Sequence, residues 1–125
     1  MLGEKKSSFR GGRPTEAEAE YLAENFIGRL ATVSLSGEPH VVPVTYRFDG
    51  ESMVFGGWNL VKSLKFRHLS ANKRVALVVD DVVSTSPWKV RGVEVRGVAE
   101  PQSTGNGSTV VKIIPRKFRS WGLQG

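Results

Sequence analysis

The residues from 56 to 67 are the part of the sequence best equipped to hold a ligand. Gly56 and Gly57 close an apolar stretch, and glycines at such a point let a ligand approach the backbone. The polar and aromatic residues that follow are Trp58, Asn59, Lys62, Ser63, Lys65 and Arg67. A hydroxyl and cations at the start of a helix, beside free N–H groups, favour an anion. The cluster is a candidate phosphate site, and its alternative is a glycine turn followed by an ordinary amphipathic helix.

Other catalytic constellations have little support in the sequence. There is no cysteine, and His40 and His68 are the only histidines, so a metal site of His and Cys ligands is not indicated. Neither a GxSxG nucleophile elbow nor a GxGxxG or P-loop pattern occurs. Four early glutamates are most simply a solvated helix face: Glu16, Glu18, Glu20 and Glu24. Metal-dependent or acid–base hydrolysis is therefore not predicted.

A second group of interest lies around Arg91. Period-two alternation places Arg91 on the same strand face as Val93 and Val95. A guanidinium on an apolar face either reaches water at the strand end, which is the commoner outcome, or meets a buried anion. Trp88 precedes it and is either a lid or interface aromatic, or a core residue. The pair Asp80-Asp81 is predicted to form a turn.

Composition and charge narrow the class of protein. The 125 residues fit one domain, with 39% hydrophobic and 24% charged residues and a formal net charge of +6. The charge is spread along the chain, apart from a basic tail, and indicates an anionic partner without specifying it. No apolar run has the length of a membrane span or the character of a signal peptide. We expect a cytoplasmic protein without disulfides.

The expected elements begin with a flexible lead-in over 1–13, followed by one cofactor-binding domain over 14–125. Thr15 and Glu18 have capping-box spacing, which predicts a helix that ends near Gly28. A second helix is expected over 59–72. Six strands are expected over 28–36, 39–48, 51–57, 74–83, 89–100 and 108–115. Residues 118–123 are left outside them.

Turn and proline positions suggest how these strands are arranged. Asp49-Gly50 is a strong hairpin turn. Pro43 cannot donate a ladder hydrogen bond, so its strand lies at an edge or carries a bulge there. Short strands joined mostly by tight turns predict a closed or partly closed antiparallel barrel. The fold class expected is therefore mainly β.

Taken together, three groups of segments resemble a known family. They are GRLATVSLSGEPHVVPVTYRFDG, then FGGWNLVKSLKFRHLSANKRVALVVDDVV with SPWKVRGVEVRGVAE, and the tail VKIIPRKFRSWGL. These segments are similar to the FMN-binding split β-barrels of the pyridoxamine 5′-phosphate oxidase-like class. Within that class they are most similar to the group that uses the deazaflavin coenzyme F420. The resemblance covers residues 21 to 123.

The resemblance implies a homodimeric, six-stranded antiparallel split β-barrel with two short helices and cofactor clefts at the subunit interface. It implies that Lys65, supported by Ser63 and Arg67, holds the cofactor phosphate. Pro43, Val44 and Thr45 would back the ring system. Trp88 and Arg91 would reach a cofactor from the partner chain.

The sequence departs from the pattern of the family at the phosphate segment. Relatives tend to carry a second lysine directly before Lys65, where this chain has Leu64. One missing cation weakens phosphate binding by about 1–3 kcal/mol unless another residue replaces it. Lys62 is the nearest replacement. Asn72-Lys73 and His68 also stand where relatives tend to have Asn-Pro and an acidic residue.

The function implied is an oxidoreductase in which reduced F420 passes a hydride to a conjugated small molecule, such as an enone, a quinone or a biliverdin-like tetrapyrrole. The cofactor carries the chemistry, so no catalytic side chain is required, and Thr45, Tyr46 and Ser63 are candidate proton donors. The first alternative is an FMN-binding flavin reductase or oxidase of the same fold, and the second is a non-enzymatic cofactor-binding protein.

A nucleic-acid partner is ranked low. Single-strand binders present aromatic residues among Lys and Arg on a sheet face. Here Trp58, Trp88 and Trp121 lie at predicted strand ends or in loops.

Overall fold

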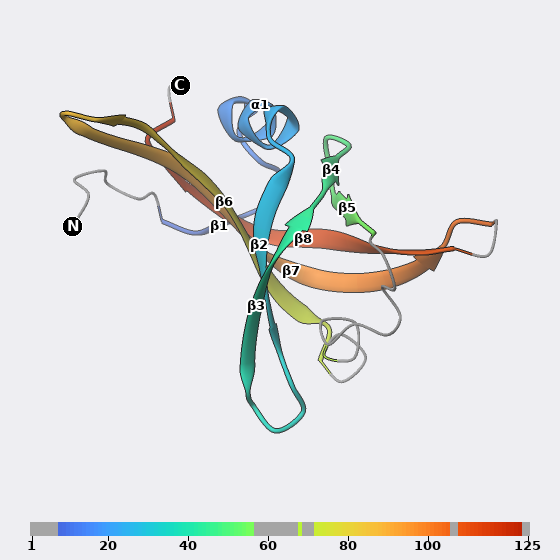
Figure 1. Cartoon of the computed structure of the whole chain (residues 1–125). Coiled ribbons are helices and arrows are strands. Elements are labelled where there is room, and N and C mark those ends of the chain that lie inside the picture. Colours follow the sequence, from blue (N-terminus) through green and yellow to red (C-terminus); the bar gives the residue numbers. More distant parts are fainter. Residues whose placement is uncertain (1–7, 57–67, 69–71, 106–107, 124–125) are drawn as a thin grey trace.

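A computed structural model of the chain describes residues 8–56, 68, 72–105 and 108–123. Its strands form one antiparallel sheet in the order β3-β2-β6-β7-β8-β5-β4, with β1 paired to β8, and the sheet curls into a half-barrel (Figure 1). The elements are β1 (Arg10–Gly11), α1 (Glu16–Glu24), β2 (Ile27–Val33), β3 (Pro39–Thr45), β4 (Arg47–Phe48), β5 (Met53–Phe55), β6 (Arg74–Thr85), β7 (Trp88–Ser103) and β8 (Thr109–Trp121). The predicted mainly-β split-barrel fold is confirmed.

Helix α1 begins where the capping box predicts. The Thr15 side chain accepts a hydrogen bond from the Glu18 amide, and the Glu18 carboxylate accepts one from the Thr15 amide. The helix ends at Glu24 and not near Gly28, so the expected C-terminal end was wrong. Phe26 lies beyond the helix and is 72% exposed, which leaves no apolar contact to extend the last turn.

Strand β3 confirms the edge position inferred from proline. It pairs only with β2 in the sheet order, and Pro43 lies opposite Arg29. Since an edge strand leaves one row of N–H groups unpaired, a residue without an N–H is tolerated there. Burial alternates between the two faces of this part of the chain, because Val44 and Tyr46 are buried, whereas Val41 is 65% exposed.

Strands β6 and β7 form a long hairpin that projects from the sheet (Figure 1). The prediction of a turn at Asp80-Asp81 was wrong, because both residues lie inside β6, opposite Gly92 and Arg91. Paired aspartates are poor strand formers by composition. Here they are held in the strand by cations, since Asp80 pairs with Arg29 and Asp81 pairs with Arg91.

Strand β8 continues beyond the point predicted from the sequence. Its end was expected at Pro115, but it runs on to Trp121 and pairs with β7 as far as Gly92. The register of β7 shifts between Arg96 and Gly97, and Gly97 lies opposite Pro115. A bulge beside a residue without a side chain accommodates the proline, so the ladder resumes after it.

The first strand also begins earlier than expected. Arg10 and Gly11, which fall in the predicted flexible lead-in, pair with Phe118 and Lys117 of β8. Glycine at position 12 has a φ of 84° and turns the chain from β1 towards the helix.

Two further differences concern the strand count and the second helix. The predicted second strand is divided at Tyr46 into β3 and β4. Together with β1, this gives eight strands among the described residues, where six were predicted. The predicted helix over 59–72 lies almost entirely outside the described residues, of which it includes only His68 and Asn72.

The core lies between α1 and the concave side of the sheet. Its largest fully buried side chains include Leu22, Leu30, Phe55, Leu77 and Phe118. Within the part of the chain that the structure describes, no helix is long and apolar enough to cross a membrane.

Candidate functional site

An open groove with a volume of about 600 Å³ lies between the β3–β4 junction, β5 and the β7–β8 hairpin. Residues from these elements line it: Thr45, Tyr46, Arg47, Asp49, Val54, Gly56, Thr104 and Val110. Three of them, namely Thr45, Tyr46 and Gly56, are site residues predicted from the sequence. A groove of this volume is of the size that binds small molecules and cofactors.

Thr45 and Tyr46 are neighbours in the chain but have different environments. Thr45 is the last residue of β3 and is exposed. The Tyr46 side chain points into the core, where its hydroxyl donates a 2.6 Å hydrogen bond to the Leu22 carbonyl. Burial raises the pKa of Tyr46 to about 12. Because the Tyr46 proton is engaged inside the core, Thr45 is the better proton-donor candidate of the two.

Gly56 directly follows β5 and gives the groove an accessible stretch of backbone. Among the described residues, a Cβ placed at this glycine would meet only Val110 Cγ1, at the ordinary contact distance of 3.6 Å. The other predicted members of the phosphate cluster lie outside the described residues: Gly57, Trp58, Asn59, Lys62, Ser63, Lys65 and Arg67. Gly56 is therefore the member of this cluster that belongs to the described residues, and it lines the groove.

Pro43 and Val44, which were also predicted to lie behind the ring system of the cofactor, point to opposite faces of β3. Pro43 is exposed on the outer face of β3, and Val44 is buried in the core with 6% exposure. Of the three residues predicted to back a ring, the groove is lined only by Thr45.

Charges of both signs border the groove. Arg47 is exposed and lines it from β4. Asp49 accepts hydrogen bonds from the amides of Ser52 and Glu51 at 2.8 and 2.9 Å, and these backbone donors lower the pKa of its carboxyl. Asp49 is thus engaged in its own turn. Arg47 lines the groove, and Lys112 lies opposite the groove residue Val54, so both cations border it.

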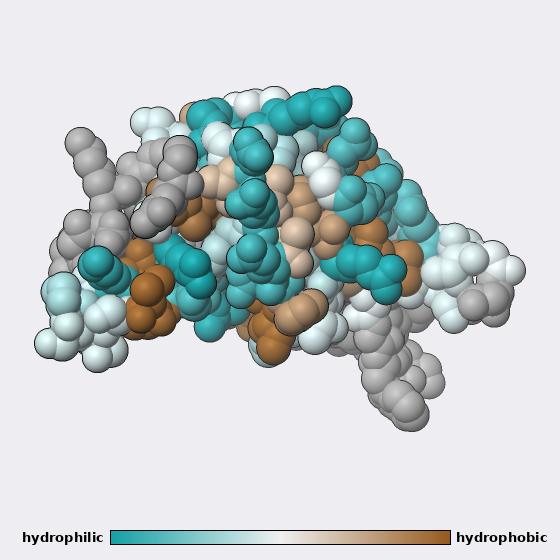
Figure 2. Space-filling model, turned by 90° about the horizontal axis from the view of Figure 1, so that it is seen from above, coloured by the Kyte–Doolittle hydropathy of each residue, from teal (hydrophilic) through white to brown (hydrophobic). Residues whose placement is uncertain are grey.

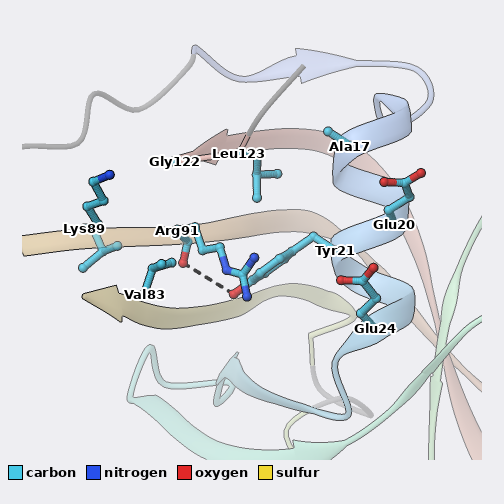
Figure 3. Close-up of a pocket in the computed structure, with 10 residues that line it drawn as sticks. Ala17, Glu20, Tyr21, Glu24, Val83, Lys89, Arg91, Gly122 and Leu123 are labelled. Atoms are coloured by element: carbon cyan, nitrogen blue, oxygen red, sulfur yellow. Dashed lines mark hydrogen bonds between the residues drawn. The ribbon is translucent and has the colours of Figure 1, made fainter. Parts of the chain in front are cut away.

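A second cavity of about 340 Å³ lies between α1, the β6–β7 hairpin and the chain after β8 (Figure 3). At its base Arg91 donates to Asp81 from Nε at 2.8 Å and from Nη2 at 3.2 Å, and the Tyr21 hydroxyl donates to the same carboxylate at 2.6 Å. The guanidinium lowers the pKa of Asp81, while burial and the carboxylate raise the pKa of Tyr21. Arg91 thus pairs with an anion, but Asp81 is not the buried anion of the second alternative, because the side chains of Arg91 and Asp81 are 40% and 38% exposed.

Trp88 lies at the start of β7, in the turn of the β6–β7 hairpin, and is 54% exposed. It is therefore not a core residue. Trp88 and Arg91 occupy the opposite end of β7 from Thr104. Along an extended strand, Arg91 is roughly 40 Å and Trp88 roughly 50 Å from it. Their predicted approach to a cofactor from the partner chain stays a prediction.

The two histidines meet at another point of the fold. The His40 and His68 rings are 5.2 Å apart between centroids in an edge-on arrangement, and His68 Nδ1 lies 2.9 Å from the Thr32 hydroxyl. Among the described residues no group of three His, Cys, Asp or Glu side chains is placed to hold a metal ion.

Sequence reasoning missed Arg47, Thr104 and Val110 as groove residues. In the predicted strand 39–48, period-two alternation puts Arg47 on the same face as Thr45, so the sequence did indicate that Arg47 could line the groove. Nothing local marks Thr104 and Val110, because they reach the groove only through the pairing of β7 with β8.

Comparison with known proteins places this arrangement in context. Residues 14–117 match the family described as pyridoxamine 5′-phosphate oxidase. The chain is 39% identical over 120 residues to a 5a,11a-dehydrotetracycline/5a,11a-dehydrooxytetracycline reductase of Streptomyces rimosus, with 89% of this chain and 84% of the relative covered.

Solved structures agree with this match. An F420 reductase superposes with a TM-score of 0.65 and 26% identity, covering 84% of this chain and 97% of the other. An FAD-binding protein from Mesorhizobium loti superposes with a TM-score of 0.69 over 91% of this chain and 99% of the other, and at 19% identity it shows the fold alone. The chain is an oxidoreductase of flavin-binding fold. From its sequence match and its fold, it belongs to the pyridoxamine 5′-phosphate oxidase-like split-barrel family.

Proposed function

We propose that this protein is a reductase that binds reduced coenzyme F420 in the groove at Thr45 and Gly56 and reduces a conjugated carbon–carbon double bond of an enone-type substrate. The observation that carries the proposal is the 39% identity, over 89% of this chain, to a reductase of dehydrotetracyclines. The likeness to an F420 reductase at 26% identity supports the choice of cofactor.

The groove fits a flat tricyclic ring followed by a phosphate. Its volume of about 600 Å³ and the lack of a side chain at Gly56 support the binding of a ring against the backbone. Arg47 is available for an anionic substituent, and Lys65, Ser63, Arg67 and Lys62 remain our proposed phosphate ligands. When bound, the reduced deazaflavin supplies the hydride.

The protein's own part in the reaction is binding, orientation and delivery of a proton. Saturating a double bond requires a hydride on one carbon and a proton on the other, and the Thr45 hydroxyl, or a water beside it, is proposed to give the proton. The name of the relative's substrate describes a molecule lacking two hydrogens at positions 5a and 11a. A polycyclic enone is therefore our proposed substrate class.

The site is proposed to be completed by a second copy of the chain. Ile27 of β2 and Val41 of β3 lie on paired strands, opposite Thr45 and Ala31 respectively, and they are 58% and 65% exposed. An exposed apolar face of this kind is typical of a protein interface. Trp88 lies too far along β7 to serve the groove of its own chain, so we assign it to the groove of the partner. Arg91 is held by Asp81 and by the Tyr21 ring of its own chain.

The decisive experiment is a parallel titration of the purified protein with F420 and FMN, followed by fluorescence and absorbance. We expect F420 to bind and to support reduction of a dehydrotetracycline, and Lys65→Ala and Gly56→Leu each to weaken F420 binding at least tenfold. Lys73→Ala, which removes an exposed lysine outside the groove, serves as the matched control.

Tight binding of FMN without binding of F420 would replace the deazaflavin in this proposal with a flavin. Binding of F420 without reduction of any enone would leave a cofactor-binding protein. The dimer is tested by sedimentation, where Val41→Lys should yield a monomer and Glu51→Lys, on an exposed turn, should not.

A further inference from the structure

The cavity between α1 and the β6–β7 hairpin has walls of opposite charge. On one side, Glu20 and Glu24 lie one turn apart on α1, and both are exposed. On the other side, Lys89 and Arg91 lie two residues apart on β7. Figure 3 shows the glutamates along the helix at one side of the cavity and Lys89 at the other, with Arg91 and Tyr21 between them.

The guanidinium in this cavity has a fixed orientation. Arg91 donates its two hydrogen bonds to Asp81 from Nε and Nη2, so these bonds do not use the two N–H groups of Nη1. The same group lies over the Tyr21 ring, with 5.2 Å between Cζ and the ring centroid. A guanidinium held on two sides loses little freedom when it binds an oxygen anion, so its remaining donors are preorganised.

The other cation is less restrained. Lys89 is exposed, and its ammonium lies on the cavity side opposite the helix. Because Asp81 compensates much of the charge of Arg91, Lys89 supplies most of the positive potential on this wall. An anionic group would therefore bind between Lys89 and the free edge of Arg91.

The space between the walls is partly apolar. Val83, Val90 and Leu123 line it, and Figure 3 shows Leu123 extending towards Arg91 and Tyr21. Seen from the helix side in Figure 2, the surface is largely hydrophilic with separate hydrophobic patches. A volume of about 340 Å³ suits a small organic molecule.

From this juxtaposition we propose that the cavity binds a zwitterionic small molecule, with its ammonium at Glu20 and Glu24, its carboxylate at Lys89 and Arg91, and its apolar part against Val83 and Leu123. The inference goes beyond the proposed function, because the cavity lies at the other end of β7 from the cofactor groove and its test contains no cofactor.

The test is a titration of ¹⁵N-labelled protein at low ionic strength with 6-aminohexanoate, and in parallel with hexanoate and hexylammonium. We expect the amide signals of Tyr21, Arg91 and Leu123 to shift and saturate with the zwitterion. We expect it to bind about three- to tenfold more tightly than either singly charged analogue, as typical exposed ion pairs would give. Added salt should reduce this advantage.

Charge-removing variants separate the two walls. Lys89→Gln should reduce the affinity for 6-aminohexanoate to that for hexylammonium, and the double variant Glu20→Gln/Glu24→Gln should reduce it to that for hexanoate. Lys73→Gln and Glu16→Gln remove the same charges outside the cavity and should change nothing. The affinities of four-carbon and eight-carbon ω-amino acids, compared with that of 6-aminohexanoate, then show which charge separation matches the distance between the two walls.

Two results would overturn the proposal. Hexanoate binding as tightly as 6-aminohexanoate would make the cavity a simple anion site. Signal shifts confined to residues of the groove, such as Thr45 and Val54, would show that the cavity holds no ligand of this class. Since neither titration includes F420 or FMN, both results leave the proposed reductase function untouched.

Discussion

Arg10 in β1 forms an ion pair with Glu18, a carboxylate whose side chain is completely buried beneath the N-terminal strand. The same carboxylate caps helix α1 by accepting from the Thr15 amide at 2.9 Å. Glu18 therefore joins β1 to the start of the helix that carries Tyr21. Phe9 also fixes the N-terminal segment to the sheet. The Cζ atoms of Arg96 and Arg119 lie over its ring, 4.1 and 4.4 Å from the ring centroid.

Removal of the Arg10 side chain should destabilise the protein. In Arg10→Ala the buried Glu18 carboxylate loses its cation, and we expect the free energy of unfolding to fall by about 2 kcal/mol. Chemical denaturation monitored by tryptophan fluorescence measures this change. Arg13→Ala removes an exposed arginine nearby as the control. A smaller loss in the double variant Arg10→Ala/Glu18→Gln would trace the effect to the unpaired charge, and an equal or larger loss would contradict it.

The stability of the protein should depend on pH through Glu18. Burial acts to raise the pKa of this carboxyl, but hydrogen bonds from Arg10, the Thr15 backbone and Ser120 outweigh burial and lower it below 4.5. A carboxyl with a lowered pKa stabilises the fold above the pKa of the unfolded chain, and this contribution is lost as the pH falls through the folded pKa. Denaturation between pH 7 and pH 3 should therefore show falling stability below about pH 4.5.

The variant Glu18→Gln tests the assignment of this pH dependence. It should be less stable than the wild type at pH 7, and the difference should narrow as the pH decreases. Glu51→Gln, on an exposed turn, controls for the loss of a carboxylate. A difference between wild type and Glu18→Gln that stays constant with pH would show that another group is responsible.

We expect the Tyr46 side chain to stabilise the core and to take no part in the reaction. Tyr46→Phe removes the donor to the buried Leu22 carbonyl, so we expect a loss of about 1–2 kcal/mol in the free energy of unfolding with the turnover rate preserved. Thr45→Val should have the reverse effect, lowering turnover with little change in stability. Ultraviolet titration should show the phenol of Tyr46 ionising at about pH 12. If Tyr46→Phe is fully folded but its turnover rate drops strongly, Tyr46 would again be a candidate for the proton donor of the reaction.

Gly97 should tolerate no side chain. A Cβ at this position would overlap the Ile114 carbonyl oxygen and lie 3.1 Å from Pro115 Cα, and both are backbone atoms that cannot move away cheaply. We expect Gly97→Ala to lower the free energy of unfolding by more than about 2 kcal/mol. Gly11→Ala, whose Cβ would stand 3.7 Å from the Arg116 carbonyl oxygen, is the control. Equal stability of the two variants would mean that the bulge can relax.

Local sequence patterns determined which residues face the core. Period-two alternation puts Val44 and Tyr46 on one face of a strand, and both are buried. The capping box located the start of α1, and Pro43 restricted its strand to an edge or a bulge, of which the structure shows the edge. These features depend on the bonding capacity of single residues and their near neighbours, so they can be inferred without knowing the partner strand.

The tertiary structure alone decided how distant segments pair. Asp81 remains in a strand because Arg91 faces it across the hairpin, and β8 passes Pro115 because Gly97 lies opposite. The groove likewise exists only where Thr45 and Thr104 approach each other. Composition and spacing do not encode such contacts, because they arise from the register of strands far apart in the chain. The family and the split-barrel fold were thus predictable from the sequence, whereas the bonds of Arg91 to Asp81 and of Tyr46 to the Leu22 carbonyl required the folded chain.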